Sequence, residues 1–100
     1  MDATDGDNRL AKLLENVTEG QWSPLEEIDW DQELILPNWI SPKLYTAAVS
    51  QLYYGEIATI WACQRLLGEL TGSRVRQFLH AQIMDEERHA DTYLMYLRRL

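Results

Sequence analysis

The chain is poor in the residues that define several common classes of protein. It has one cysteine, Cys63, so no disulfide can form within the chain, and this usage fits a reducing compartment. Positive charge is scarce, because 9 Lys and Arg stand against 16 Asp and Glu, for a formal net charge of −7. No basic patch indicates a nucleic-acid partner. The N-terminal residues lack the positive start and apolar core of a signal peptide, so we expect a cytoplasmic protein.

Uninterrupted apolar segments are also lacking. The stretch from Leu44 to Gln64 is long enough to cross a bilayer and contains a single charged residue, Glu56. Tyr, Gln, Ser and Thr interrupt it, and the pattern that follows suits a soluble packing partner. We therefore expect no membrane span, but a helical bundle that buries a carboxylate.

Neither strand alternation nor an internal repeat is present, so the sequence predicts an all-α protein. Residues 1–20 are expected to form an acidic, partly disordered tail, with a short amphipathic helix over residues 9–17. Residues 21–41 are rich in Trp and Pro and predict an irregular arm whose aromatic side chains pack inward. Residues 42–100 predict an antiparallel helical hairpin, which is half of a four-helix bundle.

The first long helix is predicted from Pro42 to about Leu70, with Ser41 as its N-cap. Gly72 is expected to close this helix, and Ser73 to cap a second helix that runs to the end of the chain. The predicted inward row of the first helix is Leu52, Glu56, Thr59, Cys63, Leu66 and Leu70. The predicted inward row of the second helix is Val75, Leu79, Gln82, Glu86, His89, Tyr93 and Leu97.

Both rows carry residues that bind metals. In an antiparallel hairpin that folds near residues 71 and 72, facing residues have numbers that sum to about 143, so Glu56 faces the Glu86-x-x-His89 motif. Glu and His three positions apart project from one helical face. Two ionised carboxylates in an apolar row repel each other unless a cation lies between them, so we predict a metal site formed by Glu56, Glu86 and His89.

The ligand types favour iron or manganese over zinc, because oxygen predominates and one imidazole is present. Cys63 is two turns from Glu56, too far to share the metal, and is expected to be a small core residue. His80 faces elsewhere and is expected at the surface or in an interface. Glu87 and Asp91 point away from the row and are expected in solvent.

The segment Ile83-Met84-Asp85-Glu86-Glu87-Arg88-His89-Ala90 resembles the D-E-x-R-H signature of ferritin-like non-haem diiron oxygenases. Gln51-Leu52-Tyr53-Tyr54-Gly55-Glu56-Ile57-Ala58 is similar to the ligand helix that precedes it in that superfamily, which includes the small subunit of class I ribonucleotide reductase. The resemblance covers residues 42–100.

The resemblance implies a diiron centre, or an iron–manganese one, in which Glu56 is a terminal ligand, Glu86 a bridging ligand and His89 a terminal imidazole. It implies that Asp85 hydrogen-bonds a ligating histidine on the other half of the site. Tyr93 stands at the step E-x-x-H-x-x-x-Y at which ribonucleotide reductase small subunits carry a radical-forming tyrosine, so a redox role for Tyr93 is weighed against simple packing.

The superfamily supplies a second Glu and a second E-x-x-H from two further helices. We therefore expect either that the chain is the N-terminal part of a longer protein, or that two copies assemble one site, as in encapsulated ferritins. The Trp-rich arm resembles the lead-in of a large oxygenase and favours the first alternative.

Two functions follow from the resemblance. The favoured one is an oxidoreductase that activates O2 and oxidises a small organic substrate. The alternative is iron oxidation for storage, with the diiron site assembled across a homodimer interface. A structural two-helix module with a vestigial site is a third reading.

Overall fold

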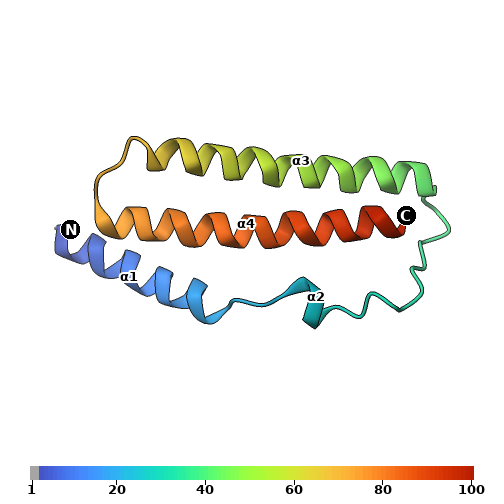
Figure 1. The fold of residues 1–100 in the computed structure, drawn as a ribbon, viewed down its shortest axis with the longest axis horizontal. Helices are drawn as coiled ribbons and strands as arrows, with labels where there is room; N and C mark the ends of the chain where they lie inside the picture. The colour runs from blue at the N-terminus through green and yellow to red at the C-terminus, as the bar shows by residue number, and fades with distance from the viewer. Residues whose placement is uncertain (1–2) are drawn as a thin grey trace.

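The computed structural model describes residues 3–100, and every regular element in that range is a helix. In chain order, the helices are α1 (Ala3–Glu19), α2 (Pro24–Glu27), α3 (Pro42–Leu67) and α4 (Ser73–Arg99). The central element is α4: α3 runs antiparallel along one of its sides, while α1 and α2 lie along another (Figure 1). The predicted all-α class is confirmed for the described residues.

Helix α1 begins six residues earlier than predicted. Residues 3–8, which we expected to belong to a disordered tail, are the first turns of a helix that ends at Glu19, while residues 1 and 2 lie outside the described range. The helix packs on α4, and Leu10 and Leu14 are half-buried. The acidic composition predicted a disordered tail because composition alone does not show that this segment packs on α4. Short helices depend on such tertiary packing for their stability.

Trp30 is one of the residues that hold the arm between α1 and α3 to α4. The indole N–H of Trp30 donates a hydrogen bond to the carbonyl oxygen of Pro24 over 2.8 Å, and its ring meets the ring of Tyr96 edge-on at 5.0 Å. The expectation that the aromatic side chains of the arm pack inward is right for Trp30 and wrong for Trp22 and Trp39, which are 39% and 80% exposed.

The start of α3 is the predicted one. The Ser41 hydroxyl accepts a hydrogen bond from the backbone N–H of Leu44 over 3.1 Å, and Pro42 occupies the first helical position, where its missing N–H has no cost.

The turn between α3 and α4 differs from the prediction. The first helix ends at Leu67 with Gly68 as its C-cap, and Gly72 is the N-cap of α4, so Ser73 is its first helical residue rather than its cap. The guanidinium of Arg76 donates hydrogen bonds to the backbone carbonyl oxygens of Leu67 and Leu70. These bonds satisfy carbonyl groups at the end of α3, a task that a C-terminal glycine in the left-handed conformation often helps to fulfil.

The row of α3 that packs against α4 is only partly the predicted one. The row that the structure buries wholly or in part is Val49, Tyr53, Glu56, Ile60, Cys63 and Leu67. The prediction was right for Glu56 and Cys63, which belong to both rows. It was wrong for four members that are exposed: Leu52, Thr59, Leu66 and Leu70. The two rows lie side by side on α3, and both are largely apolar. The helical periodicity of the sequence therefore could not show which of them packs against α4.

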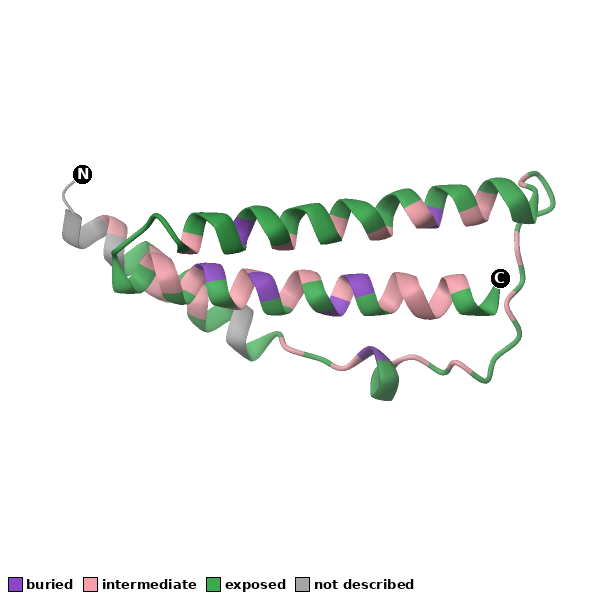
Figure 2. Cartoon of the chain, turned by 45° about the horizontal axis from the view of Figure 1, so that its top comes forward, coloured by how far each residue is buried: buried purple, intermediate pink, exposed green. Residues whose placement is uncertain are grey.

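The predicted inward row of α4 is confirmed, since each of its members is buried or half-buried. Near the turn, Cys63 of α3 packs with Leu79 and Ile83 of α4 to form the apolar core. Figure 2 shows that the buried positions gather mainly on α4, between α3 and the N-terminal segments. A search of the described residues finds no helix that combines the length and apolar character needed to span a membrane.

Candidate metal centre

The turn between α3 and α4 sets the register that brings the predicted ligands together. With α3 and α4 antiparallel, Glu56 lies halfway along α3 and meets Glu86 and His89 at the same height of α4. One ligand atom from each of these three side chains lies within 4.8 Å of the other two. The three residues that the sequence singled out as ligands are therefore neighbours in the folded chain.

The distances suit a shared ion. Nδ1 of His89 lies 3.6 Å from Oε1 of Glu56 and 3.5 Å from Oε2 of Glu86. Ligand atoms bound at about 2.0–2.2 Å to one ion lie roughly 3.0–4.2 Å apart, depending on the angle at the ion. The same nitrogen thus faces one carboxylate from each helix at a separation that a bound cation allows.

The two carboxylates are well shielded from water, while the imidazole is more open. The side chains of Glu56 and Glu86 are 18% and 12% exposed, against 39% for His89. Gln82, one turn before Glu86, donates a hydrogen bond from its amide nitrogen to Oε1 of Glu86 over 2.7 Å. This bond leaves Oε2 directed at the imidazole and fixes the orientation of the carboxylate.

Asp85 contacts the imidazole of its own helix. Its Oδ2 lies 3.8 Å from Nε2 of His89, which is ion-pair range but longer than a hydrogen bond. Its Oδ1 accepts a hydrogen bond from Nη2 of Arg88. The resemblance had implied contact with a histidine from another half of the site. The contact seen within this chain, to His89 of the same half, is a different one.

Arg88 is the one buried charged residue among those described, and the sequence pattern did not predict a role for it. Its side chain is 7% exposed and its guanidinium reaches three partners: Asp85, Gln21 of the arm and the Trp22 ring, whose centroid lies 5.5 Å away. Its Nε has no hydrogen-bond partner within the described residues. Arg88 belongs to the D-E-x-R-H segment and could have been noticed there, but nothing in the spacing predicted its contact with Gln21, 67 positions earlier.

The remaining candidates lie apart from the cluster. Tyr93 is half-buried one turn after His89, and the group of three ligands does not include it. Cys63 is in the apolar core, as expected for a structural residue. His80 is exposed, and so are Glu87 and Asp91, in agreement with their assignment to solvent.

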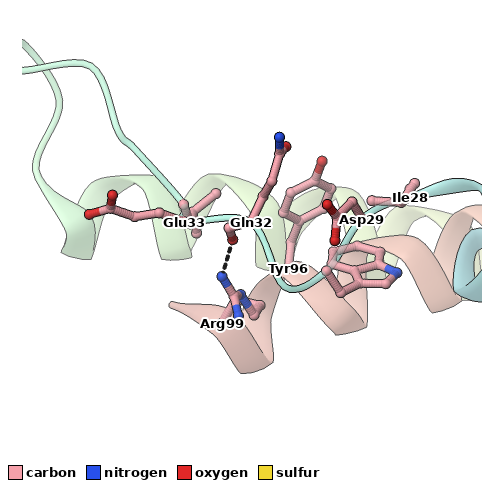
Figure 3. Close-up of a pocket in the computed structure, with 8 residues that line it drawn as sticks. Ile28, Asp29, Gln32, Glu33, Tyr96 and Arg99 are labelled. Atoms are coloured by element: carbon pink, nitrogen blue, oxygen red, sulfur yellow. Dashed lines mark hydrogen bonds between the residues drawn. The ribbon is translucent and has the colours of Figure 1, made fainter.

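The chain also has a small pocket at the end of α4, away from the candidate ligands. It has a volume of about 140 Å³ and lies between the arm and α4, where Figure 3 shows Arg99 donating a hydrogen bond to the backbone carbonyl oxygen of Gln32. None of the three candidate ligands lines this pocket, nor does Asp85. It is therefore no access route to the cluster.

Comparison with known proteins adds no relative. No protein-family model matches the chain, and neither a curated protein nor a solved structure matches it significantly. Arguments about function therefore rest on the residues and their geometry.

Proposed function

We propose that Glu56, Glu86 and His89 bind iron and form half of a carboxylate-bridged diiron centre of the ferritin-like type. The observation that carries the proposal is the meeting of the three ligand atoms within 4.8 Å at the middle of an antiparallel helix pair. A Glu from one helix with a Glu-x-x-His from its neighbour is the half-motif of such centres in helical bundles.

The donor set supports iron, or an iron–manganese pair, over zinc. Two carboxylates and one imidazole are hard, oxygen-rich ligands, whereas structural zinc sites favour thiolates and several imidazoles. Three protein ligands are fewer than two ions need. We infer that the other ligands come from a second copy of the chain or from further helices.

The favoured activity is that of a non-haem oxidoreductase. When bound, the iron pair would supply the reduction of O2 that drives oxidation of an organic substrate. The chain would contribute ligand orientation, through the hydrogen bond from Gln82 to Glu86, and partial exclusion of water from the two carboxylates.

The alternative is an iron-oxidising storage protein that completes the site across a homodimer interface. One observation favours it: Leu52, Thr59 and Leu66 are exposed beside Glu56 on α3. A second hairpin could cover this flank and bring its own three ligands opposite the first set. In that case, oxygen would be consumed with Fe(II) as the only reductant.

Metal binding is the first test. The metal-free chain would be titrated anaerobically with Fe(II), and iron per chain measured by elemental analysis. The parent should retain iron, whereas Glu56→Ala, Glu86→Ala and His89→Ala should each lose most of it, with Glu86→Ala lowest because a bridging ligand serves two ions. His80→Ala and Glu87→Ala are matched controls, since both side chains are exposed on the same helix.

The same titration also shows whether the three side chains bind a metal or only contact one another. Fe(II) at 100 times its dissociation constant should stabilise the parent by about 2.7 kcal/mol. If the parent gains no stability and the ligand variants carry as much iron as the controls, the cluster is only a contact between an imidazole and two carboxylates, and the metal proposal is wrong.

The two activities differ in their reductant. An oxygenase, given its organic substrate and an added reductant that supplies two electrons, should consume one O2 for each oxidised organic product. A storage protein should instead consume O2 in proportion to added Fe(II) with no organic product. Oxygen uptake by the assembled protein, measured with and without candidate organic substrates, decides between them.

A role for Tyr93 is tested in the same assembled protein. A packing tyrosine changed to Phe should lose roughly 1 kcal/mol of stability and leave the oxygen reaction unchanged. A redox tyrosine should give a radical signal in electron paramagnetic resonance after the Fe(II) form meets air, and Tyr93→Phe should remove that signal at unchanged iron content. Absence of any tyrosyl radical in the parent would exclude the redox role.

A further inference from the structure

A line of contacts connects the N-terminal arm to the candidate metal centre. Nη1 of Arg88 donates a hydrogen bond to Oε1 of Gln21, and the guanidinium lies against the ring of Trp22. Nη2 of the same guanidinium donates to Oδ1 of Asp85. The second oxygen of that carboxylate lies 3.8 Å from Nε2 of His89.

The two ring nitrogens of His89 therefore face different groups. Nδ1 faces Glu56 and Glu86, where a metal ion would bind, and Nε2 faces Asp85. A carboxylate beside the outer nitrogen of a ligating imidazole selects the tautomer that leaves the inner nitrogen free to bind metal, and holds the orientation of the ring. Whatever holds Asp85 in place acts on His89.

We propose that Gln21 and Trp22 are positioning residues for this centre: by holding Arg88 they fix Asp85 at Nε2 of His89, and so orient the imidazole toward the metal. The part of this inference that concerns metal affinity rests on the proposed iron site. The part that concerns the imidazole itself does not.

The burial of Arg88 is the physical reason why the arm matters. The side chain of Arg88 is 7% exposed, and a buried guanidinium depends on pairing of its N–H groups. Because Nε has no hydrogen-bond partner within the described chain, the bonds made by Nη1 and Nη2 are the ones that stabilise it. Without the oxygen of Gln21, Nη1 would lose its partner too. The guanidinium would then turn toward water, and Asp85 would move with it.

The experiment compares two arm variants with two matched controls in the full chain. Gln21→Ala and Trp22→Leu remove the contacts with Arg88. Gln32→Ala and Trp39→Leu change the same residue types in the same arm, at exposed positions that are not among the partners of Arg88 described above. Arg88→Lys is the third test variant, because lysine keeps the charge but cannot bridge Gln21 and Asp85 with a planar fork.

Two readouts are used. The first is the ¹⁵N nuclear magnetic resonance spectrum of the imidazole rings in the metal-free chain, which shows which nitrogen of His89 carries the proton. The chain has 2 histidines, so the exposed His80 serves as an internal reference. The second is the affinity for Co(II), used as a spectroscopic probe and titrated by visible absorption.

In the parent, we expect a larger population of the His89 tautomer with its proton on Nε2 than in the three test variants, because Asp85 beside Nε2 favours that tautomer while Glu56 and Glu86 beside Nδ1 favour the other. Gln21→Ala, Trp22→Leu and Arg88→Lys should reduce the population of that tautomer and weaken Co(II) binding by about 10-fold, the lower end of what outer partners of metal ligands contribute. The two controls should stay within about twofold of the parent, as expected for substitutions remote from the ligands. A purely structural role for the arm would lower stability without changing the tautomer.

The proposal is overturned if the three test variants match the controls in the tautomer population, or if the tautomer changes while Co(II) affinity does not. If the parent binds no Co(II), the iron site itself fails, and the tautomer comparison still decides whether the arm positions His89. Should circular dichroism show that Gln21→Ala is unfolded, Gln21→Asn replaces it, since it retains the amide but shortens its reach by one methylene.

Discussion

The two long helices differ in how their composition matches their burial: α3 is apolar but largely exposed, and α4 is rich in charge but better buried. Helix α3 has three charged residues, Lys43, Glu56 and Arg65, yet six of its large apolar side chains are exposed: Leu44, Leu52, Tyr54, Ile57, Trp61 and Leu66. Helix α4 is rich in charge, yet Met84 is its one exposed large apolar residue within the described chain. Contacts explain the difference, because α4 packs against α3, α1 and α2, whereas α3 packs against α4 alone among the described helices.

Helix α3 is so apolar that packing against one neighbouring helix leaves much of its apolar surface exposed. Helices that are apolar nearly all round are typical of protein interiors, and contiguous exposed apolar surface marks an association site. The candidate ligand Glu56 lies on this helix, between the flank that faces α4 and the flank that is uncovered. Completion of the surface and completion of the metal site are therefore expected to occur together.

The largest effect is expected in self-association. The parent chain should form a dimer or a larger assembly at micromolar concentration in sedimentation equilibrium, because exposed apolar side chains line both flanks of α3. Trp61→Lys and Leu66→Lys, one on each flank, should each weaken association by about 30- to 1000-fold, the range of the hot-spot residues of an interface. Met84→Lys on α4 is the control, and a monodisperse parent monomer would contradict the prediction.

The second prediction compares the same substitution on the two helices. Leu79→Ala empties part of the core and should lower the free energy of unfolding by roughly 2–4 kcal/mol, since Leu79 is 8% exposed. Leu44→Ala on α3, where the side chain is 59% exposed, should cost less than about 1 kcal/mol. Urea denaturation of both variants at one protein concentration gives the comparison, and equal losses would show that Leu44 is covered in solution.

A smaller effect is expected where α4 supports the end of α3. Arg76→Ala removes the hydrogen bonds to the carbonyl oxygens of Leu67 and Leu70 and should lower the free energy of unfolding by about 1–2 kcal/mol. Gln77→Ala, at the next position and exposed, should have almost no effect. If the two variants unfold at the same denaturant concentration, Arg76 does not cap α3.

The smallest effects concern the helix starts. Ser41→Ala removes the side-chain cap of α3 and should cost about 1 kcal/mol. The N-cap of α4 is Gly72, which has no side chain to offer, so Gly72→Ser should stabilise the chain by only a few tenths of a kcal/mol. Thermal unfolding should shift in opposite directions for the two variants; a loss of stability in Gly72→Ser would mean that its hydroxyl does not reach the orphan N–H groups.

Part of the candidate site was predictable because it depends on local rules. The position of the turn near residue 72 sets the antiparallel register, and the helical period places Glu86 and His89 on one face, so their meeting with Glu56 followed from counting. The outer contacts were not predictable in this way. Arg88 and Gln21 are 67 residues apart, and no periodicity relates an irregular arm to a helix.

The helix ends show the same division. Ser41 and Pro42 were recognised because a cap acts through its nearest neighbours. The end of α3 at Leu67 was missed because Arg76, from the next helix, satisfies its carbonyl groups in place of the expected glycine at position 72.

The sequence by itself therefore determined the helical class, the start of α3 and the height at which the three candidate ligands meet, since each depends on residues a few positions apart or on the register of a single turn. Only the tertiary structure decided which apolar row of α3 packs against α4, that residues 3–8 are helical, and that Arg88 joins the arm to Asp85. Each of these outcomes depends on how segments far apart in the sequence pack together. Two rows of α3 are apolar enough to face α4, and only the packing of the whole chain selects one of them.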